Sequence, residues 1–444
     1  MNFTKEQFGS DFSWGISTSA YQCEGAHLDN GKGHSIWDKF SEKRGRILND
    51  DHANIACDFY NRYEEDIELL KYLNIPNFRF SLSWSRIMPD GSGVVNQQGI
   101  DFYNRVIDKC LSVGITPWIT IYHWDLPHAL ELKGGWTNRE IINHFSDYVQ
   151  VCAQHFSNRV KHWMVLNEPM VFTGAGYFLG VHAPGRKGAQ NFIAALHHAV
   201  LCQATGGRIL KTFDTTLQVG TTFSCSHITP ATNSKRDVAA AVRMDALLNR
   251  MFIEPALGMG YPLTDLKFLQ RLEKVFKPGD EKLMPHDFDF IGIQNYTREV
   301  AAYSFFTPYL QAKLISASKR NVTHTVMKWE VFPEAIYEMI KKFSAYKNVK
   351  KIIITENGAA FHDQLIDEKV DDKERTDFLK NYLAAVLKAK ADGYKIDGYF
   401  IWTLLDNFEW AEGYYPRFGI VHVDFETQKR TIKGSGHWYK KFLS

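Results

Sequence analysis

The stretch Lys351-Ile352-Ile353-Ile354-Thr355-Glu356-Asn357-Gly358 joins an apolar run to a polar turn that contains a carboxylate. A second stretch, His162-Trp163-Met164-Val165-Leu166-Asn167-Glu168-Pro169, has the same order of residue types. Neither apolar run alternates with polar residues, which is typical of parallel strands that are covered on both faces. The two stretches therefore predict buried strands of a parallel sheet, each with a glutamate at its carboxyl end.

Six further apolar runs bring the number of predicted strands to eight. In chain order the strands are predicted at residues 12–17, 77–81, 116–121, 162–166, 217–223, 288–293, 351–354 and 398–403. Amphipathic stretches lie between them and predict helices over 60–73, 100–113, 139–155 and 372–391. In the first of these, Tyr63, Ile67, Leu70 and Leu73 are spaced by three and four residues, which places them on one helical face.

Strands that alternate with helices favour a closed barrel of the α/β class. We predict a (β/α)8 TIM barrel with long loops at the C-terminal face of the strands, at about 24–58, 170–190 and 295–345. An open doubly wound sheet is the alternative, but no glycine-rich phosphate loop follows any early strand. Although the length of 444 residues could suggest about two or three domains, α/β barrels exceed the usual domain length, so we expect a single catalytic domain over 1–444.

The composition argues against several classes of partner. The formal net charge is only +2, and the basic residues are scattered, so we expect neither nucleic acid nor a membrane as a partner. The N-terminus lacks the apolar region of a secretory signal, and the six dispersed cysteines are expected to be free thiols; together these features predict a cytoplasmic protein.

The pair His197-His198 has no Glu or Cys at metal-ligand spacing, so we expect no metal there. We expect no other cofactor either. The sequence makes no prediction of the oligomeric state.

Large polar and aromatic residues follow the predicted strands, where a barrel would bring them to one mouth. Each alone has an ordinary explanation, such as a helix cap, an ion pair or a core aromatic side chain. Together, carboxylates and amides suit sugar hydroxyls, and indole rings suit the apolar face of a sugar. In chain order these residues are Gln22, Glu24, Arg79, His123, Trp124, Asn167, Glu168, Gln294, Asn295, Tyr296, Glu356, Trp402, Glu409 and Trp410.

Two carboxylates at strand ends are the minimum requirement for cleaving a glycosidic bond by acid/base and nucleophilic catalysis. A nucleophile must stay ionised, and for Glu356 the expected supports are Arg79 and the Tyr296 hydroxyl. A general acid must hold a proton near neutral pH, and burial together with a negative neighbour would raise the pKa of Glu168. Once Glu356 is esterified its charge is lost, so Glu168 is expected to act next as the general base.

Six motifs, in order along nearly the whole chain, resemble those of glycoside hydrolase family 1, the β-glucosidase family. They are Phe12-Ser13-Trp14-Gly15 through Tyr21-Gln22-Cys23-Glu24-Gly25, Phe78-Arg79-Phe80-Ser81, Tyr122-His123-Trp124-Asp125-Leu126-Pro127, Asn167-Glu168-Pro169, Ile354-Thr355-Glu356-Asn357-Gly358 and Trp402-Thr403-Leu404-Leu405-Asp406-Asn407-Phe408-Glu409-Trp410.

The resemblance implies a retaining enzyme with Glu168 as acid/base and Glu356 as nucleophile. It also implies that Gln22, His123, Asn167, Glu409 and Trp410 hold the hydroxyls of the non-reducing sugar, that Trp402 lies beneath the ring, and that Trp329 lies on the aglycone side. Trp124 and Tyr296 are expected to bind the substrate as well. The chain departs from the family at Gln294-Asn295-Tyr296, where Asn-Tyr-Tyr is usual. Aligning Tyr296 with the tyrosine that contacts the nucleophile gives Gln294 the usual Asn position, and Asn295 is still expected to face the sugar.

We therefore predict a β-glucosidase that removes terminal β-D-glucosyl residues from β-glucosides and short, cellobiose-like oligosaccharides, with a role in cellulose degradation. Activity on fucosyl or galactosyl rings and transglycosylation are expected as side reactions. A thioglucosidase of the myrosinase type would carry Gln in place of Glu168, and a phospho-sugar hydrolase would lack the pair Glu409-Trp410. The alternatives from other classes are a non-catalytic sugar-binding protein on the same barrel and a metal-dependent sugar isomerase.

Overall fold

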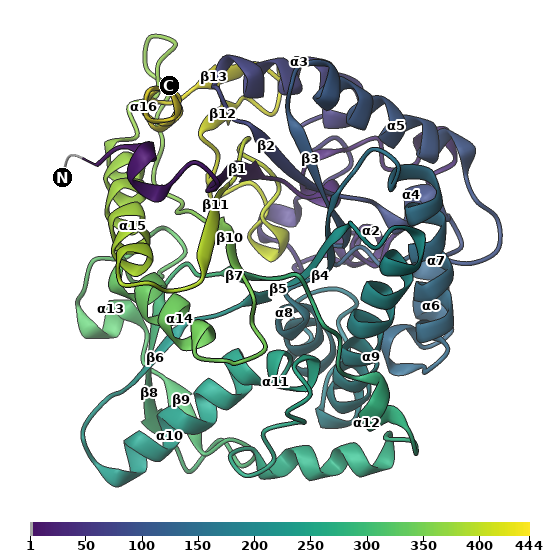
Figure 1. Cartoon of the computed structure of the whole chain (residues 1–444), viewed down its shortest axis with the longest axis vertical. Helices are drawn as coiled ribbons and strands as arrows, with labels where there is room; N and C mark the ends of the chain where they lie inside the picture. Colours follow the sequence, from purple (N-terminus) through teal and green to yellow (C-terminus); the bar gives the residue numbers. More distant parts are fainter. Residues whose placement is uncertain (1–2) are drawn as a thin grey trace.

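Eight parallel strands form a closed barrel in this computed structural model, which describes residues 3–444 (Figure 1). The strands follow the order β1-β11-β10-β7-β5-β4-β3-β2 around the barrel, so barrel strands that are consecutive in the chain pair with each other. The predicted (β/α)8 barrel is confirmed. The barrel strands are β1 (Ser13–Ser17), β2 (Asn77–Ser81), β3 (Thr116–Tyr122), β4 (His162–Asn167), β5 (Gln218–Ser224), β7 (Phe290–Gln294), β10 (Ile352–Asn357) and β11 (Ile396–Trp402).

The largest departure from the predicted strand bounds is at β10, which was expected to end at Ile354. The strand continues through the polar residues to Asn357 because Glu356 pairs with Gln294 of β7, and Asn357 pairs with Ile401 of β11. The register of β10 against β7 shifts between Ile354 and Glu356. Such a bulge re-aims the side chains beside it, and here it lies next to a candidate catalytic glutamate.

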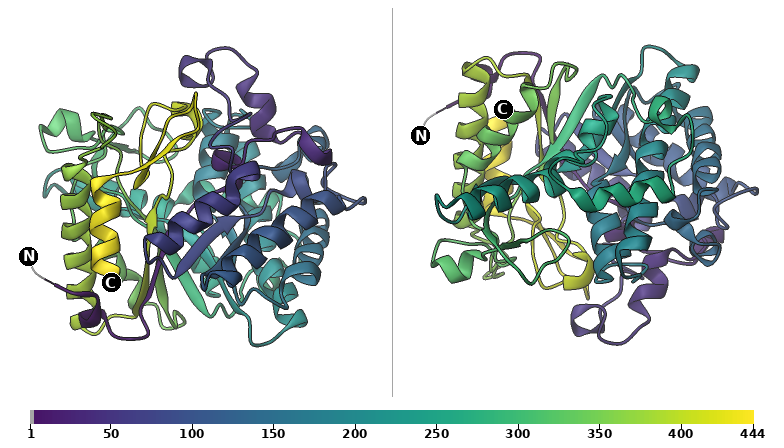
Figure 2. Two further views of the ribbon diagram at one scale, coloured as in Figure 1. Left: turned by 90° about the horizontal axis from the view of Figure 1, so that it is seen from above. Right: turned by 90° about the horizontal axis from the view of Figure 1, so that it is seen from below.

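Long helices cover the outside of the barrel, and their apolar faces pack against the strands. The four predicted helices are present with bounds that differ by up to three residues, as α3, α5, α7 and α15. The principal helices are α3 (Phe59–Tyr72), α5 (Gln97–Ser112), α7 (Ile141–Phe156), α9 (Ala189–Phe213), α14 (Glu334–Ser344), α15 (Lys373–Ala391) and α16 (Gly434–Leu443). Figure 2 shows α16 beside α15 at the C-terminal end of the chain.

The barrel interior is filled by a layer of large apolar side chains, so it is a packed core and not a channel. Trp118, Met164, Phe290, Ile353 and Phe400, from five different strands, form this layer. Gly15 leaves room for it, since a Cβ atom there would lie 2.3 Å from Cε1 of Phe400. The floor beneath the mouth of the barrel is therefore rigid.

The predicted long loops contain short elements of their own. A three-stranded sheet of β6 (His227–Pro230), β8 (Arg298–Tyr303) and β9 (Ala312–Leu314) packs against α10 (Lys235–Asp245) at one end of the molecule (Figure 1). The hairpin of β12 (Val421–Val423) and β13 (Arg430–Ile432) precedes α16. The short helices are α1 (Ala20–Cys23), α2 (Ile36–Ser41), α4 (Trp84–Ile87), α6 (His128–Leu132), α8 (Pro169–Thr173), α11 (Ile253–Ala256), α12 (Asp280–Leu283) and α13 (Ala317–Arg320).

Across residues 3–444, no helix combines the length and the apolar character that crossing a bilayer requires. The six cysteines are buried free thiols. The single-domain organisation and the cytoplasmic location stay predictions.

Candidate active site

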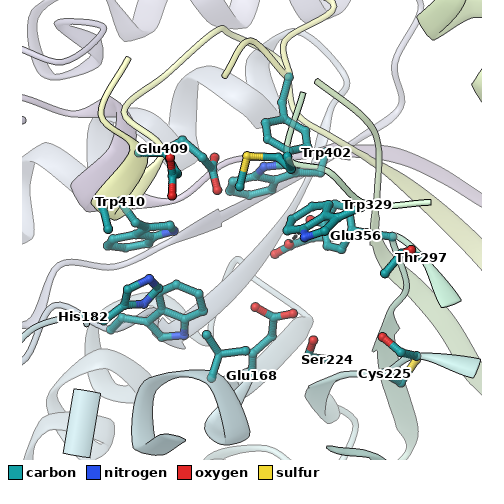
Figure 3. Close-up of a pocket in the computed structure, with 18 of the residues that line it drawn as sticks. Glu168, His182, Ser224, Cys225, Thr297, Trp329, Glu356, Trp402, Glu409 and Trp410 are labelled. Carbon is teal, nitrogen blue, oxygen red and sulfur yellow. Dashed lines mark hydrogen bonds between the residues drawn. The ribbon is translucent and has the colours of Figure 1, made fainter. Parts of the chain in front are cut away.

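A pocket of about 380 Å³ opens at the C-terminal ends of the barrel strands (Figure 3). Gln22, His123, Trp124, Glu168, Tyr296, Trp329, Glu356, Trp402, Glu409 and Trp410, all predicted from the sequence, line it. They lie at or after the ends of six of the barrel strands, or in the loop before α14. The closed barrel thus brings residues that are up to 388 positions apart, Gln22 and Trp410, into one cavity.

Glu356 lies near the end of β10 and is held by two donors. Nη1 of Arg79 donates to Oε1 at 2.5 Å, and the Tyr296 hydroxyl donates to Oε2 at 2.6 Å. Burial raises the pKa of Glu356, while the charge of Arg79 and the two hydrogen bonds oppose this rise. These donors favour the ionised form, which a nucleophile requires.

Glu168 directly follows β4 and points into the same pocket as Glu356 (Figure 3). Its backbone is in the left-handed region, with φ at 43°, a strained conformation for a residue with a side chain. Burial and the negative charge of Glu356 raise its pKa well above the ordinary value, and the nearby Ser224 hydroxyl opposes this only in part. Among residues 3–444 no cation contacts Glu168 as Arg79 contacts Glu356, so the surroundings of Glu168 favour the protonated form.

Beneath the pocket, the side-chain amide of Asn167 contacts three other side chains. Its Oδ1 accepts hydrogen bonds from Nη2 of Arg79 at 2.6 Å and from Nε2 of Gln294 at 2.8 Å. Its Nδ2 lies 2.9 Å from Nε2 of His123. Burial and the charge of Arg79 lower the pKa of His123 well below its ordinary value, so the imidazole is neutral.

Gln22 and Glu409 form a polar edge of the same pocket. Nε2 of Gln22 donates to Oε2 of Glu409 at 3.2 Å and to the Phe408 carbonyl at 2.9 Å. Burial and the charge of Glu356 raise the pKa of Glu409 to about 8. An amide and a carboxyl group side by side can donate to and accept from adjacent sugar hydroxyls.

Four indole rings, those of Trp124, Trp329, Trp402 and Trp410, also line the pocket. The ring centroids of Trp124 and Trp410 lie 4.6 Å apart, and His123 lies 6.0 Å from Trp402. On another side of the pocket, Trp329 lies 5.2 Å from Tyr296. These faces suit the apolar CH surfaces of a pyranose ring.

Five predicted residues do not line the pocket. One of them, Gln294, is completely buried, and its Nε2 donates to Asn167. Arg79 and Asn167 are completely buried beneath it and act through Glu356 and His123. Asn295 was expected to face the sugar, but its Nδ2 donates to the carbonyls of Cys225 and Thr297, both at 3.0 Å. Glu24 pairs instead with Arg86 at 2.9 Å and with Tyr103. The physical reason is similar in both cases. Backbone carbonyls bind Nδ2 of Asn295, and a buried cation binds Glu24, away from the mouth.

The sequence did not identify His182, Met327 and Phe418 as pocket residues, although all three line it. His182 lies in the loop after η5 (Gly174–Leu179), with its ring 6.0 Å from that of Trp124. Phe418 packs 6.2 Å from Tyr296. None of them directly follows a barrel strand. His182 and Met327 lie within the predicted long loops at about 170–190 and 295–345, but the sequence did not show which residues of these loops would face the pocket.

Comparisons with known proteins agree with this geometry. The family model described as glycosyl hydrolase family 1 matches residues 4–444. Beta-glucosidase A of Thermotoga maritima is 43% identical over 443 residues, covering 99% of this chain and 98% of that protein. Beta-glucosidase A of Acetivibrio thermocellus is 40% identical and covers 99% of each chain.

Among solved structures, the family 1 β-glucosidase of Thermotoga maritima in complex with isofagomine lactam superposes with a TM-score of 0.94 at 41% identity. It covers 100% of this chain and 99% of that one. A match over the whole barrel, together with a pocket that holds both strand-end glutamates, leaves one conclusion: this chain belongs to glycosyl hydrolase family 1.

Proposed function

We propose that this protein is a retaining β-glucosidase that hydrolyses terminal, non-reducing β-D-glucosyl residues by double displacement. The observation that carries the proposal is the unequal environment of the two glutamates. Arg79 and Tyr296 hold Glu356 as a carboxylate, whereas burial beside that carboxylate keeps Glu168 protonated. The β-glucosidase names of the relatives support the choice of sugar.

In the first step an oxygen of Glu356 attacks the anomeric carbon, and the bond to the leaving oxygen breaks as Glu168 transfers its proton to that oxygen. The product is a glycosyl ester of Glu356 and a free alcohol. Esterification removes the negative charge that raises the pKa of Glu168, so Glu168 stays ionised. It then takes a proton from water, which attacks the anomeric carbon and releases glucose and the carboxylate of Glu356.

The configuration of the product that is first released tests this mechanism. Two displacements at one carbon restore its configuration, so NMR of a β-glucoside during hydrolysis is expected to show β-glucose before the α-anomer appears by mutarotation. Early release of α-glucose would contradict the assignment of Glu356 as a nucleophile.

The pH dependence of kcat/KM is expected to be bell-shaped. Below the pKa of Glu356 the nucleophile is protonated and the rate falls; above the raised pKa of Glu168 the general acid is lost and the rate falls again. The variant Glu168→Gln is expected to lose the alkaline limb for a dinitrophenyl glucoside, whose leaving group needs no proton, while the acid limb remains. An unchanged alkaline limb in this variant would show that another group gives rise to it.

We further propose cellobiose-like oligosaccharides as substrates, side activity on fucosyl and galactosyl rings, and transfer of glucose to acceptors. Trp329 and Trp124 line the pocket and offer faces on which an acceptor sugar could stack. Transfer requires only that an acceptor hydroxyl replaces water in the second step. At high cellobiose concentration we expect glucosyl-cellobiose by chromatography, and its complete absence would argue against an acceptor site.

A further inference from the structure

The loop between β11 and β12 carries several of the residues that line the active-site pocket. Glu409, Trp410 and Phe418 are among them. A Cβ atom on Gly419 would be only 2.2 Å from the backbone nitrogen of Asp406, so the two ends of the loop lie against each other. Residues 407–418, called the pocket loop below, therefore begin and end at one place in the fold.

The side chain of Asp406 joins the two ends of the pocket loop. Its Oδ1 accepts a hydrogen bond from the backbone N–H of Gly419 at 2.9 Å, and its Oδ2 accepts one from Nη1 of Arg417 at 3.0 Å. The same Nη1 donates to the Val423 carbonyl at 2.8 Å, which ties this end of the loop to β12. Asp406 is completely buried. One carboxylate at the start of the pocket loop therefore holds the residues at its end.

Lys433, directly before α16, supplies the balancing positive charge. Its completely buried Nζ donates to Oδ1 of Asp406 at 2.6 Å and to Oδ2 of Asp363 at 2.5 Å. Burial opposes the ionisation of Asp406, but the charges of Lys433 and Arg417 outweigh burial and hold its pKa below the ordinary value. Asp406 is therefore a carboxylate at neutral pH. Asp406 and Lys433 together are called the clasp below.

The three residues that follow Asp406 all contact Gln22. Nε2 of Gln22 lies within 3.2 Å of Oδ1 of Asn407, the Phe408 carbonyl oxygen and Oε2 of Glu409. Because Gln22 and Glu409 form the polar edge of the pocket, the position of this edge depends on where the pocket loop begins. A displacement of about 1 Å that originates far from the reacting atoms can lower activity by about 10²-fold.

A buried ion pair such as the clasp is a poor means of stabilising a fold. The loss of hydration of both charges offsets their attraction, and apolar side chains of similar volume often stabilise a protein equally well. A carboxylate that accepts hydrogen bonds from charged donors, however, holds those donors at short and defined distances. The clasp is therefore suited to fixing the base of the pocket loop.

We propose that Asp406 and Lys433 are positioning residues, which hold the pocket loop so that Gln22 and Glu409 meet the hydroxyls of the sugar. This role rests on the proposed β-glucosidase function. Neither residue of the clasp lines the pocket, so both act through the loop. Binding of the sugar, more than the two chemical steps, is the property that the clasp controls.

Two variants test the proposal through the Kd of glucose, measured by calorimetry without turnover. Lys433→Met removes the cation alone. Asp406→Asn/Lys433→Met removes one charge of each sign, so no buried carboxylate loses its only cation, since Asp363 keeps Arg375 at 2.8 Å. Each variant is expected to raise the Kd by at least about tenfold. A wild-type Kd in either variant would overturn the proposal.

Steady-state kinetics with an alkyl β-glucoside separate positioning from a loss of folded enzyme. A smaller fraction of folded molecules lowers kcat and leaves KM unchanged, whereas a displaced pocket loop is expected to raise KM. The matched control is Arg139→Met, which removes the cation 2.5 Å from the buried Asp280; neither residue lines the pocket. The control is expected to keep the wild-type KM. An increase in KM as large as that of Lys433→Met would refute the positioning role.

A double-mutant cycle with Glu409→Gln locates the effect at the polar edge of the pocket. Because this edge is already displaced in Asp406→Asn/Lys433→Met, Glu409→Gln is expected to weaken glucose binding at least about threefold less there than in the wild type. Equal effects in both backgrounds would refute an action through Glu409. A wild type that fails to bind glucose would contradict the proposed function and this role together, whereas glucose binding that is unaffected by the clasp variants would overturn this role alone.

Discussion

Glu356→Gly is expected to lower kcat/KM for aryl β-glucosides by at least about 10⁴-fold, or ~5 kcal/mol of transition-state stabilisation. The variant removes the nucleophile and leaves Arg79 without its buried anionic partner, now 2.5 Å away. Steady-state kinetics with a dinitrophenyl glucoside measures the loss. Glu412→Gln, which changes an exposed carboxylate at the rim of the same pocket, serves as the matched control and is expected to retain most activity.

Azide is expected to restore turnover of the dinitrophenyl glucoside by Glu356→Gly. The anion fits the space of the deleted carboxylate beside Arg79 and Tyr296 and attacks the anomeric carbon from the same face. A single displacement then yields the α-glycosyl azide, which NMR distinguishes from the β-product. Formation of the β-azide by this variant would mean that the roles of Glu356 and Glu168 are reversed.

Glu168→Ala is expected to affect substrates according to their leaving groups. For alkyl glucosides, which need protonation, kcat/KM should fall about 10²- to 10⁴-fold. A dinitrophenyl glucoside should still form the glycosyl ester of Glu356, and the intermediate should accumulate because no base activates water. A pre-steady-state burst of dinitrophenol, followed by slow turnover, is the expected signature.

Azide is expected to accelerate the slow second step in Glu168→Ala and to give the β-glycosyl azide. Removing the Glu168 carboxylate takes away the negative charge that repels the anion from the face opposite Glu356. The control Glu168→Gln fills the space of the original side chain, so azide should rescue it less. If the dinitrophenyl and alkyl glucosides lost activity equally in Glu168→Ala, a role as general acid would be refuted.

The site residues that lie at strand ends could be predicted, because the carboxyl ends of all strands in a parallel barrel meet at one face. Glu168 and Glu356 each follow an uninterrupted apolar run, and the barrel brings both to one mouth. Asn295 shows the limit of this reasoning. It follows β7 as directly as Tyr296 does, yet its Nδ2 donates to the carbonyls of Cys225 and Thr297, and tertiary packing brings the Cys225 carbonyl to it.

The sequence by itself determined the barrel, its eight strands and the two glutamates, because these depend on local residue pattern and on the order of elements along the chain. Only the tertiary structure decided the unequal partners of the two glutamates, the burial of Asn295 and the contacts among four aromatic rings from separate segments. Phe178, Phe192, Phe268 and Tyr309 share no motif or spacing. Their contacts depend on how loops fold over the barrel, and the pKa of each glutamate depends on charges and burial that are set by residues far away in the sequence.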